Sequence, residues 1–275
     1  MSNFRALAFI ILTALIATAT SVSAQTTLKV DGSTGAMPLI AALAKVYQAK
    51  TPSVRIETGK GLGTRARIDA LNTGSIDIAV ASHGLRMEEL VKQGLVVDEI
   101  ARTPVVLGVN ASVPVTNISQ AQVCEIYSGN LSNWNAAGGP DLTVAARTRP
   151  DSEVDTEVVR DEIACLKVLK MPDAVKVMPS SGDMANELAT TAGSIGMTTM
   201  TVVEQSGDKI KVLWLDGVAP TEANVVAGKY RLIREVFLVA KASASLETKA
   251  FIAFIKSADG AKIIKANGAI PKVGN

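Results

Sequence analysis

Histidine is almost absent from this chain, and catalytic sequence motifs are absent altogether. His83 is the only histidine among 275 residues. No Gly-x-Ser-x-Gly, His-Glu-x-x-His or Walker-type phosphate loop occurs, so no local pattern marks a nucleophile, a catalytic metal or a nucleotide site. A catalytic triad would depend on His83, for which the sequence marks no nucleophile. Hydrolysis by two carboxylates that are distant in the sequence stays open. Because no local catalytic motif occurs, we expect a protein that is not an enzyme and that has no cofactor or metal.

The chain also lacks a strong excess of charge of either sign. It contains 28 Lys and Arg residues and 26 Asp and Glu residues, and removal of Arg5 with the N-terminal segment leaves 27 against 26. Nucleic-acid-binding domains show a basic excess or patch, so nucleic acid is not an expected partner. A small anion would have to be bound by a local site and not by the overall field of the protein.

The N-terminal segment has the pattern of an export signal. Arg5 supplies the positive charge, residues 6–17 are an apolar run, and Val22-Ser23-Ala24 is a small-x-small pattern before Gln25. A membrane anchor is the alternative, but the run is short for about 30 Å of hydrocarbon and a cleavage pattern follows it. The cleavage point has no cysteine, so the sequence does not indicate a lipid anchor. No later segment is apolar enough to cross a bilayer. We predict that residues 1–24 are a signal peptide and that the mature protein is periplasmic.

Cys124 and Cys165 are the only two cysteines. In an oxidising compartment, one pair is most simply interpreted as a single disulfide. Two buried free thiols are the alternative, since the sequence does not show whether the two Cα atoms lie within about 7 Å of each other. Their spacing matches no zinc motif.

Short strands and helices alternate along the mature chain. Strand patterns at 27–30, 54–57 and 76–80 are separated by segments in which apolar residues recur at helical spacing. This order predicts an α/β fold with a mainly parallel sheet, without internal repeats or a long linker. Further strands are expected at 104–109, 142–146, 193–197, 211–215 and 230–240, and further helices after Ser119, after Ser152 and around 251–255.

Four loops follow predicted strands and lead toward helices. Open α/β sheets bind ligands at this edge, and helix N-termini present amide groups that suit an anion. Glycine lets backbone amides approach a ligand, and hydroxyl groups can donate hydrogen bonds. Each loop alone is common in α/β proteins and its charged residues can simply face water, but together the loops predict an anion site. They are Asp31–Met37, Thr58–Arg65, Ala81–Gly84 and Arg147–Ser152.

Short motifs in a specific order and spacing extend over nearly all of the mature chain. They are Asp31-Gly32-Ser33-Thr34 with Pro38-Leu39, Gly59 to Gly63, Asp77 to Ser82, Glu125 to Gly129 with Asn133-Trp134, Gly193 to Met197, Asp216 to Thr221, and Gly268 to Pro271. In this arrangement the chain resembles the substrate-binding proteins of ABC-type phosphate transporters, within the type II periplasmic binding protein class.

The resemblance implies a two-lobed α/β fold in which each lobe is a mainly parallel sheet flanked by helices. Lobe one would comprise residues 25–106 plus 205–275, and lobe two residues 107–204. The ligand, phosphate or a related small oxyanion, would lie in the cleft between the lobes, which close by a hinge motion. The implied partner is a membrane ABC permease, and the protein is expected to be a monomer.

The resemblance also implies which residues contact the anion. Glu153 and Asp155 follow the fourth loop, beside the expected site, where an acidic side chain would repel an anion unless it points away or accepts a ligand proton. The residues expected at the site are Gly35, Ala36 and Met37 in the first loop, Lys60 or Thr64 in the second, Ser82 and His83 in the third, and Arg149 and Ser152 in the fourth.

Two other functions remain open at this stage. A periplasmic sensor would bind the same ligand and signal to a membrane kinase, and an extracellular enzyme could use the same scaffold. Genes for a permease and an ATPase beside this one would favour import, whereas turnover of a phosphate ester would favour the enzyme.

Overall fold

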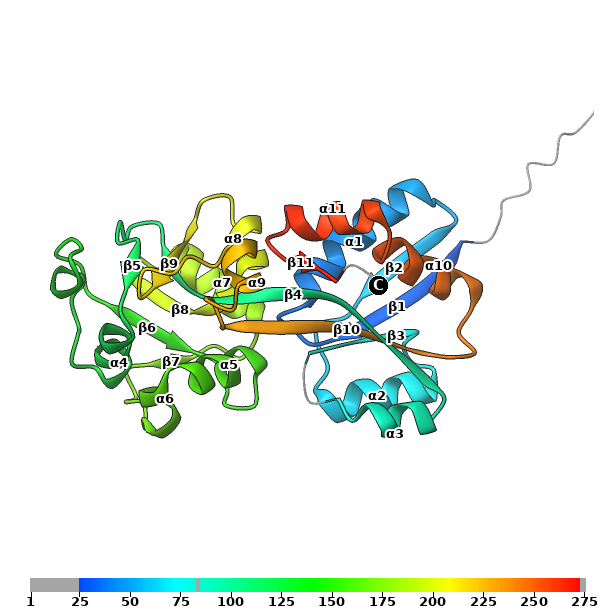
Figure 1. Cartoon of the computed structure of the whole chain (residues 1–275), viewed down its shortest axis with the longest axis horizontal. Helices are drawn as coiled ribbons and strands as arrows, with labels where there is room; N and C mark the ends of the chain where they lie inside the picture. Colours follow the sequence, from blue (N-terminus) through cyan, green and yellow to red (C-terminus); the bar gives the residue numbers. More distant parts are fainter. Residues whose placement is uncertain (1–24, 83–84, 273–275) are drawn as a thin grey trace, which may run out of the picture.

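The computed structural model of the chain describes residues 25–82 and 85–272, so the predicted signal peptide, residues 1–24, lies outside the described residues. Two lobes lie side by side, and strands β4 (Leu95–Asn110) and β10 (Ile233–Lys241) run between them (Figure 1). In the part of the chain that is described, no helix has the length and apolar character needed to cross a bilayer.

The sheet of the first lobe has the strand order β2-β1-β3-β10-β4. β1 (Thr26–Gly32) pairs in parallel with β2 (Val54–Thr58) and with β3 (Ile78–Ala81). β10 then pairs antiparallel with both β3 and β4. All four residues of β3 are buried, as expected for a central strand that is covered on both faces. The parallel pairing brings the loops that follow β1 and β3 to one edge of the sheet.

Helices cover both faces of this sheet (Figure 1). α1 (Met37–Lys50), α10 (Leu246–Ile255) and α11 (Ala258–Ala266) pack in one apolar cluster, and α2 (Thr64–Thr73) and α3 (Met87–Lys92) border another. The short strand β11 (Ile270–Pro271) pairs with β4. The first cluster includes Leu28, Val30, Leu39, Ile40, Leu43, Val236, Leu238, Phe251 and Ile255.

Strand β4 belongs to both lobes. Its residues up to Pro104 pair with β10, and Val105 to Val109 pair with β8 (Ser194–Thr199) of the second lobe. The sequence predicted only residues 104–109 as strand, because charged residues interrupt the apolar pattern in the first half of β4. A single strand shared by two sheets makes one of the two covalent connections between the lobes.

The sheet of the second lobe extends from β4 in the order β4-β8-β6-β7. β6 (Ala145–Thr148) pairs in parallel with β8 and with β7 (Lys176–Val177). β9 (Ile210–Leu215) pairs antiparallel with the last four residues of β4, and β5 (Asn117–Ile118) pairs with β9. The loop after β6 therefore leaves this sheet at the carboxyl edge of a parallel strand.

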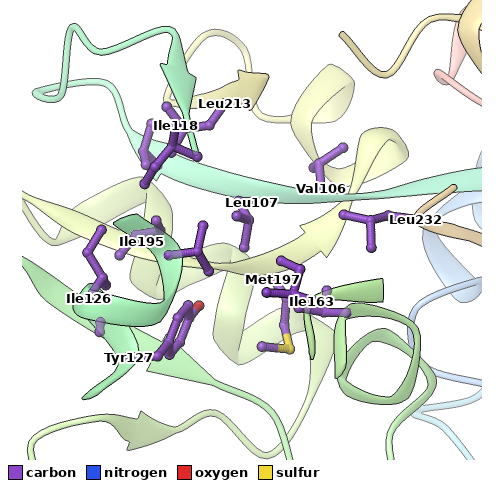
Figure 2. Close-up of a cluster of buried hydrophobic side chains, with 14 of the residues drawn as sticks. Val106, Leu107, Ile118, Ile126, Tyr127, Ile163, Ile195, Met197, Leu213 and Leu232 are labelled. Carbon is purple, nitrogen blue, oxygen red and sulfur yellow. The ribbon is translucent and has the colours of Figure 1, made fainter. Parts of the chain in front are cut away.

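The second lobe has its own apolar core, in which residues of its sheet and of its helices pack together (Figure 2). Val106, Leu107, Tyr127, Ile195 and Met197 are among its buried members. The helical elements of this lobe are α4 (Gln120–Ser128), the 3-10 turn Trp134–Ala137, α5 (Val154–Glu162), α6 (Ala164–Val168), α7 (Ser181–Thr190), α8 (Met200–Gln205) and α9 (Glu222–Val226).

The second connection between the lobes lies later in the chain than the sequence indicated. We expected the chain to return to lobe one near residue 205. The buried residues Leu213, Val225, Tyr230 and Leu232 instead pack in the core of the second lobe. The chain returns only where Ile233 pairs with Pro104 at the start of β10. The apolar pattern of β9 predicts a strand but does not say which sheet the strand joins, and this explains the difference.

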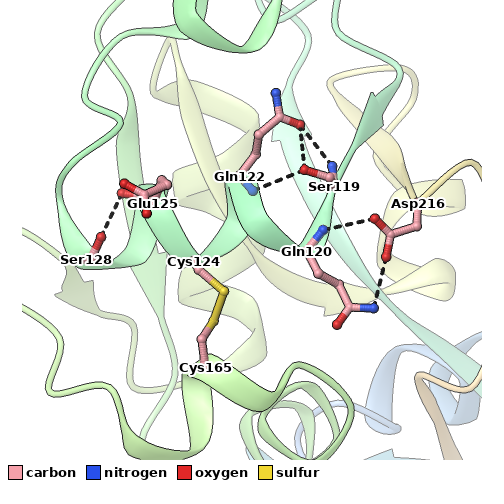
Figure 3. Close-up of a disulfide and its surroundings, with 8 residues drawn as sticks. All are labelled: Ser119, Gln120, Gln122, Cys124, Glu125, Ser128, Cys165 and Asp216. Atoms are coloured by element: carbon pink, nitrogen blue, oxygen red, sulfur yellow. Dashed lines mark hydrogen bonds between the residues drawn. A yellow bond between two sulfur atoms is a disulfide. The ribbon is translucent and has the colours of Figure 1, made fainter.

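The predicted disulfide between Cys124 and Cys165 is confirmed, with a Cα–Cα distance of 6.1 Å. It joins α4 to α6 (Figure 3). The start of α4 at Ser119 is also confirmed, because the Ser119 hydroxyl accepts a hydrogen bond from the amide of Gln122 and the Gln122 side chain accepts one from the Ser119 amide. The disulfide closes a loop that contains β6 and the arginine-bearing segment after it.

Reduction of this disulfide should lower the free energy of unfolding by about 2–4 kcal/mol, because it releases a loop with a sequence separation of 41 residues in the unfolded chain. Urea unfolding of the oxidised protein and of the Cys124→Ser/Cys165→Ser variant measures the difference. Intact mass before and after alkylation without reductant checks the bond itself. Two alkylated thiols in protein isolated from the periplasm would contradict the prediction.

Candidate anion-binding site

Two loops of the first lobe place serine hydroxyls around the guanidinium of Arg234. Ser33 follows β1 and Ser82 follows β3. Nη2 of Arg234, near the start of β10, donates to the Oγ atoms of both serines at 2.6 Å. Arg234 is only 1% exposed, so its charge is held inside the protein. Because an arginine only donates, each serine oxygen accepts and keeps its own hydrogen available for a further acceptor.

The turn between β1 and α1 fits closely against Arg234. A Cβ atom at Gly35 would lie 2.0 Å from Nη1 of Arg234, so this position requires glycine. Ala36 and Met37 are buried at the start of α1, and the Ser33 carbonyl accepts from both of their amides. The predicted first loop therefore lies beside the arginine, with its glycine in direct contact.

Asp31 organises the glycine loop that follows β2. Its Oδ1 accepts hydrogen bonds from the amides of Gly32 at 2.7 Å and Gly61 at 2.9 Å. A Cβ atom at Gly59 would lie 1.9 Å from the Asp31 carboxylate, so a larger residue would displace it. The Lys60 side chain, one of the two predicted contacts in this loop, is exposed to solvent. The other, Thr64, is the first residue of α2, and its side chain is outside what the structure describes.

The second lobe contributes Arg149, which follows β6. Its Nη1 donates to Ser181 Oγ at 2.7 Å, and its Nη2 donates to Thr34 Oγ1 of the first lobe at 3.3 Å. The Glu153 carboxylate lies 2.9 Å from the same Nη2. The Arg149 side chain has no exposed area, and its Nε has no hydrogen-bond partner among the described residues. Such a buried, unsatisfied donor can bind an oxygen atom that comes from outside the chain.

An ion pair connects the two lobes beside these groups. Asp155, in the first turn of α5, accepts from Nη1 of Arg234 at 2.5 Å. The two side chains are 3% and 2% exposed. Asp155 is the only carboxylate among the described residues that is buried. Together with the contact between Arg149 and Thr34, this pair holds the lobes against each other.

Buried positive charge dominates the space between the lobes. Arg67, on α2, is also buried, and its Nη1 donates to the Val80 carbonyl at 2.9 Å. Burial lowers the pKa of Arg67, and the charge of Arg234 lowers it further. Burial likewise lowers the pKa of Arg149, whereas the charges of Asp155 and Glu153 act in the opposite direction. An added anion would stabilise the charged form of each of these guanidinium groups.

Arg147 stands two residues before Arg149 but is engaged elsewhere. Its Nε donates to Glu187 Oε1 on α7 at 2.7 Å, and its Nη2 lies 2.6 Å from the same oxygen. This side-chain hydrogen bond lowers the pKa of Glu187. Arg147 therefore fastens α7 to β6 and does not extend toward the groups around Arg149.

Replacing Glu187 with glutamine should lower the free energy of unfolding by about 1–2 kcal/mol at pH 7, because the charged partner of a buried arginine is lost. The folded-state pKa of Glu187 is depressed. Its contribution is therefore present above the unfolded carboxyl pKa of about 4.3 and is lost as the pH falls through the folded value. Urea unfolding at pH 7 and at pH 3.5 should show a smaller difference at the lower pH. The exposed Glu125→Gln variant is the control, and an equal loss at both pH values would contradict the prediction.

Ser152 and His83, like Lys60 and Thr64, are predicted contacts that the structure does not place in the site. Ser152 is exposed, and α5 begins at Val154 with Glu153 as its N-cap, so the expected helix start at Ser152 is wrong. The polar run before α5 forms a turn first, in which the Glu153 amide donates to the Pro150 carbonyl. His83 lies outside the described residues. In the described part of the chain, no group of His, Cys, Asp and Glu side chains could hold a metal ion.

Known proteins resemble this chain in sequence and in structure. A family model for the PBP superfamily domain matches residues 17–259. The phosphate-binding protein PstS of Bacillus subtilis is 27% identical over 246 residues, which cover 89% of this chain and 80% of the relative. PstS of Borreliella burgdorferi is 23% identical over 95% of this chain and 96% of its own length.

Solved structures give the same result. A candidate phosphate ABC transporter substrate-binding protein from Clostridium perfringens, solved with bound phosphate, has a TM-score of 0.73 at 27% identity and covers 90% of this chain and 100% of its own. An ABC-type phosphate transport receptor from Vibrio cholerae has a TM-score of 0.60 at 27% identity, with 88% and 99% of the two chains covered. The expected type II periplasmic binding protein fold and the resemblance to this group of proteins are confirmed. Because the family model matches most of its length, the chain belongs to the PBP superfamily.

Proposed function

We propose that this protein captures phosphate, or a closely related small oxyanion, between its lobes. The observation that carries the proposal is the orientation of four hydroxyl groups. Ser33 and Ser82 accept from Arg234, and Thr34 and Ser181 accept from Arg149. A hydroxyl whose oxygen accepts from a guanidinium can direct its hydrogen to another acceptor, which suits an anion. Thr34 and Ser181 lie 3.3 Å from each other, so one hydroxyl of that pair can donate to the other while the second keeps its hydrogen for a ligand.

The backbone and the charges around these hydroxyls support the same ligand. The loops after β1, β3 and β6 begin at the carboxyl ends of parallel strands, and α5 and α7 start beside the arginine that follows β6. Helix starts provide amide donors and a partial positive charge for an anion. The unsatisfied Nε of Arg149 supplies another donor in the same place. The names of the similar proteins, which are phosphate-binding proteins, favour phosphate among the oxyanions.

In this proposal the protein binds its ligand without converting it and delivers it to a membrane ABC permease from outside the cytoplasmic membrane. The similar proteins are binding proteins and transport receptors. Two lobes that enclose a ligand by hinge motion suit capture and release, because opening the lobes exposes every contact at once. The predicted signal peptide at residues 1–24 agrees with this location.

A thermal-shift panel tests the ligand. Protein unfolded and refolded free of ligand is heated with phosphate, arsenate, sulfate or molybdate, and chloride serves as the control anion. A ligand at 100 times its Kd should stabilise the folded protein by about 2.7 kcal/mol, which gives a clear rise in Tm. Phosphate should give the largest rise. No rise with any oxyanion would refute the proposed function, and a loss of phosphate uptake at low concentration on deletion of the gene would test delivery.

A further inference from the structure

The buried carboxylate of Asp155 pairs with Arg234 beside the hydroxyls of Ser33 and Ser82. Its Oδ1 lies 2.5 Å from Nη1 of Arg234, whose Nη2 donates to Ser33 and Ser82. These are the hydroxyls that the proposed function, on which this inference rests, assigns to the ligand. Asp155 therefore already contacts the guanidinium that an incoming anion would approach.

The position of Asp155 on its helix has the same consequence. It lies in the first turn of α5, a helix of nine residues, where the helix start favours a negative charge. The partial positive charge of the helix start, which would stabilise a bound anion, thus also stabilises the carboxylate of the chain itself. A ligand between the lobes must compete with Asp155 for both the helix start and Arg234.

The other carboxylate at the site differs in its freedom to move. Glu153 contacts Arg149, but its side chain is 29% exposed and can turn toward solvent when a ligand arrives. The Asp155 side chain is 3% exposed and its partner Arg234 is 2% exposed, so Asp155 cannot gain water without separation of the lobes. A like charge within about 4–6 Å of a bound anion disfavours the charged form of either group.

We propose that Asp155 is an internal competitor of the ligand and lowers its affinity. The carboxylate neutralises Arg234 and joins the lobes. A bound oxyanion takes over part of this contact, against the remaining charge of Asp155. Asp155 thus lowers affinity because it adds a negative charge to the site. It weakens the binding of all oxyanions of the same charge alike.

A different role for the carboxylate predicts a different pattern. If Asp155 accepted a proton from the ligand, it would favour hydrogen phosphate, which carries a proton, over sulfate, which does not. Removing the charge would then weaken phosphate and strengthen sulfate. If Asp155 is an internal competitor, removing its charge strengthens the binding of both phosphate and sulfate. Measuring both ligands therefore distinguishes the two roles.

The test is calorimetric titration of phosphate and of sulfate, at pH 8 and fixed ionic strength, into ligand-free wild type, Asp155→Asn and Asp151→Asn. Asp151 is a matched control, because it lies four residues earlier, is 76% exposed and pairs with Arg160. We expect Asp155→Asn to lower the Kd for both anions about tenfold or more through the loss of a like charge. Asp151→Asn should change neither Kd by more than about twofold.

Each outcome decides the inference. Tighter binding of both anions by Asp155→Asn supports the proposal that Asp155 competes with the ligand. Measurable sulfate binding in the variant counts as tighter binding if sulfate binding by wild type is too weak to measure. Weaker binding of phosphate together with tighter binding of sulfate overturns the proposal in favour of a proton acceptor. Unchanged affinities for both anions overturn the proposal while the proposed function stands. Failure of wild type and variant to bind any oxyanion overturns both. If Asp155→Asn does not fold by near-UV circular dichroism, Asp155→Ser, which keeps a small acceptor for Arg234, replaces it.

Discussion

Replacing Arg234 with methionine should lower the free energy of unfolding by about 3–5 kcal/mol in phosphate-free buffer. Arg234 and Asp155 form an ion pair in which both side chains are at most 3% exposed. Removing one partner of such a pair leaves an uncompensated buried charge, and this desolvation penalty explains the size of the effect. Ser33 and Ser82 also lose the donor that they share. Urea unfolding monitored by far-UV circular dichroism measures the difference.

Two further variants show whether the effect belongs to the pair. The double variant Arg234→Met/Asp155→Leu should regain most of the loss, because apolar groups of similar size often replace a buried ion pair without a large penalty. Arg231→Met is the matched control. Its side chain is 68% exposed and pairs with Glu162 at the surface, so it should lose less than about 1 kcal/mol. A loss from Arg234→Met no larger than that of the control would show that the pair does not stabilise the closed lobes.

The features that the sequence predicted well are local ones. The loop after β1, the helix start at Ser119 and the arginine loop after β6 each depend on residues within a few positions of one another. Turn and cap patterns of this kind can be recognised without knowledge of the rest of the fold. The predicted contacts Gly35 and Ser82 lie against Arg234, and the predicted Arg149 reaches across the lobes.

Arg234 itself was not predicted, because its role depends on long-range contacts. It lies in a strand whose apolar pattern gives no sign of a binding residue. Its partner Ser33 is 201 residues away in the sequence, and Asp155 is 79 residues away. Only the pairing of β10 with β3 and β4 brings these groups together.

Ser181 was missed although the sequence contained a signal for it. Ser180 and Asp183 form a capping box, which marks the start of α7 just where Ser181 meets Arg149. Recognition of that pattern would have added a fifth loop to the predicted site. Lys60 and Ser152 are the opposite case, because the sequence predicted them at the site and the structure does not place them there. The motif is present, but both side chains are exposed, and the direction of a side chain in a loop does not follow from the motif.

Arg149→Ala should weaken phosphate binding by about 30-fold to 4,000-fold, which corresponds to about 2–5 kcal/mol for a charged partner lost from a desolvated site. The Arg149 side chain is fully buried, contacts hydroxyls of both lobes and keeps an unsatisfied Nε. Calorimetric titration with phosphate measures the change. Arg160→Ala is the control, because Arg160 lies on the same lobe but pairs with the exposed Asp151.

Arg149→Lys tests what the arginine contributes beyond its charge. A lysine at this position keeps one positive charge but lacks the planar arrangement of donors that contacts Ser181 and Thr34 and that would also bind a ligand oxygen. We therefore expect the affinity of Arg149→Lys for phosphate to lie well below that of wild type and above that of Arg149→Ala. Wild-type affinity in the lysine variant would mean that charge alone is required, and the unsatisfied Nε would then have no part in binding. Unchanged affinity in Arg149→Ala would show that this arginine does not bind the ligand, although it contacts hydroxyls of both lobes.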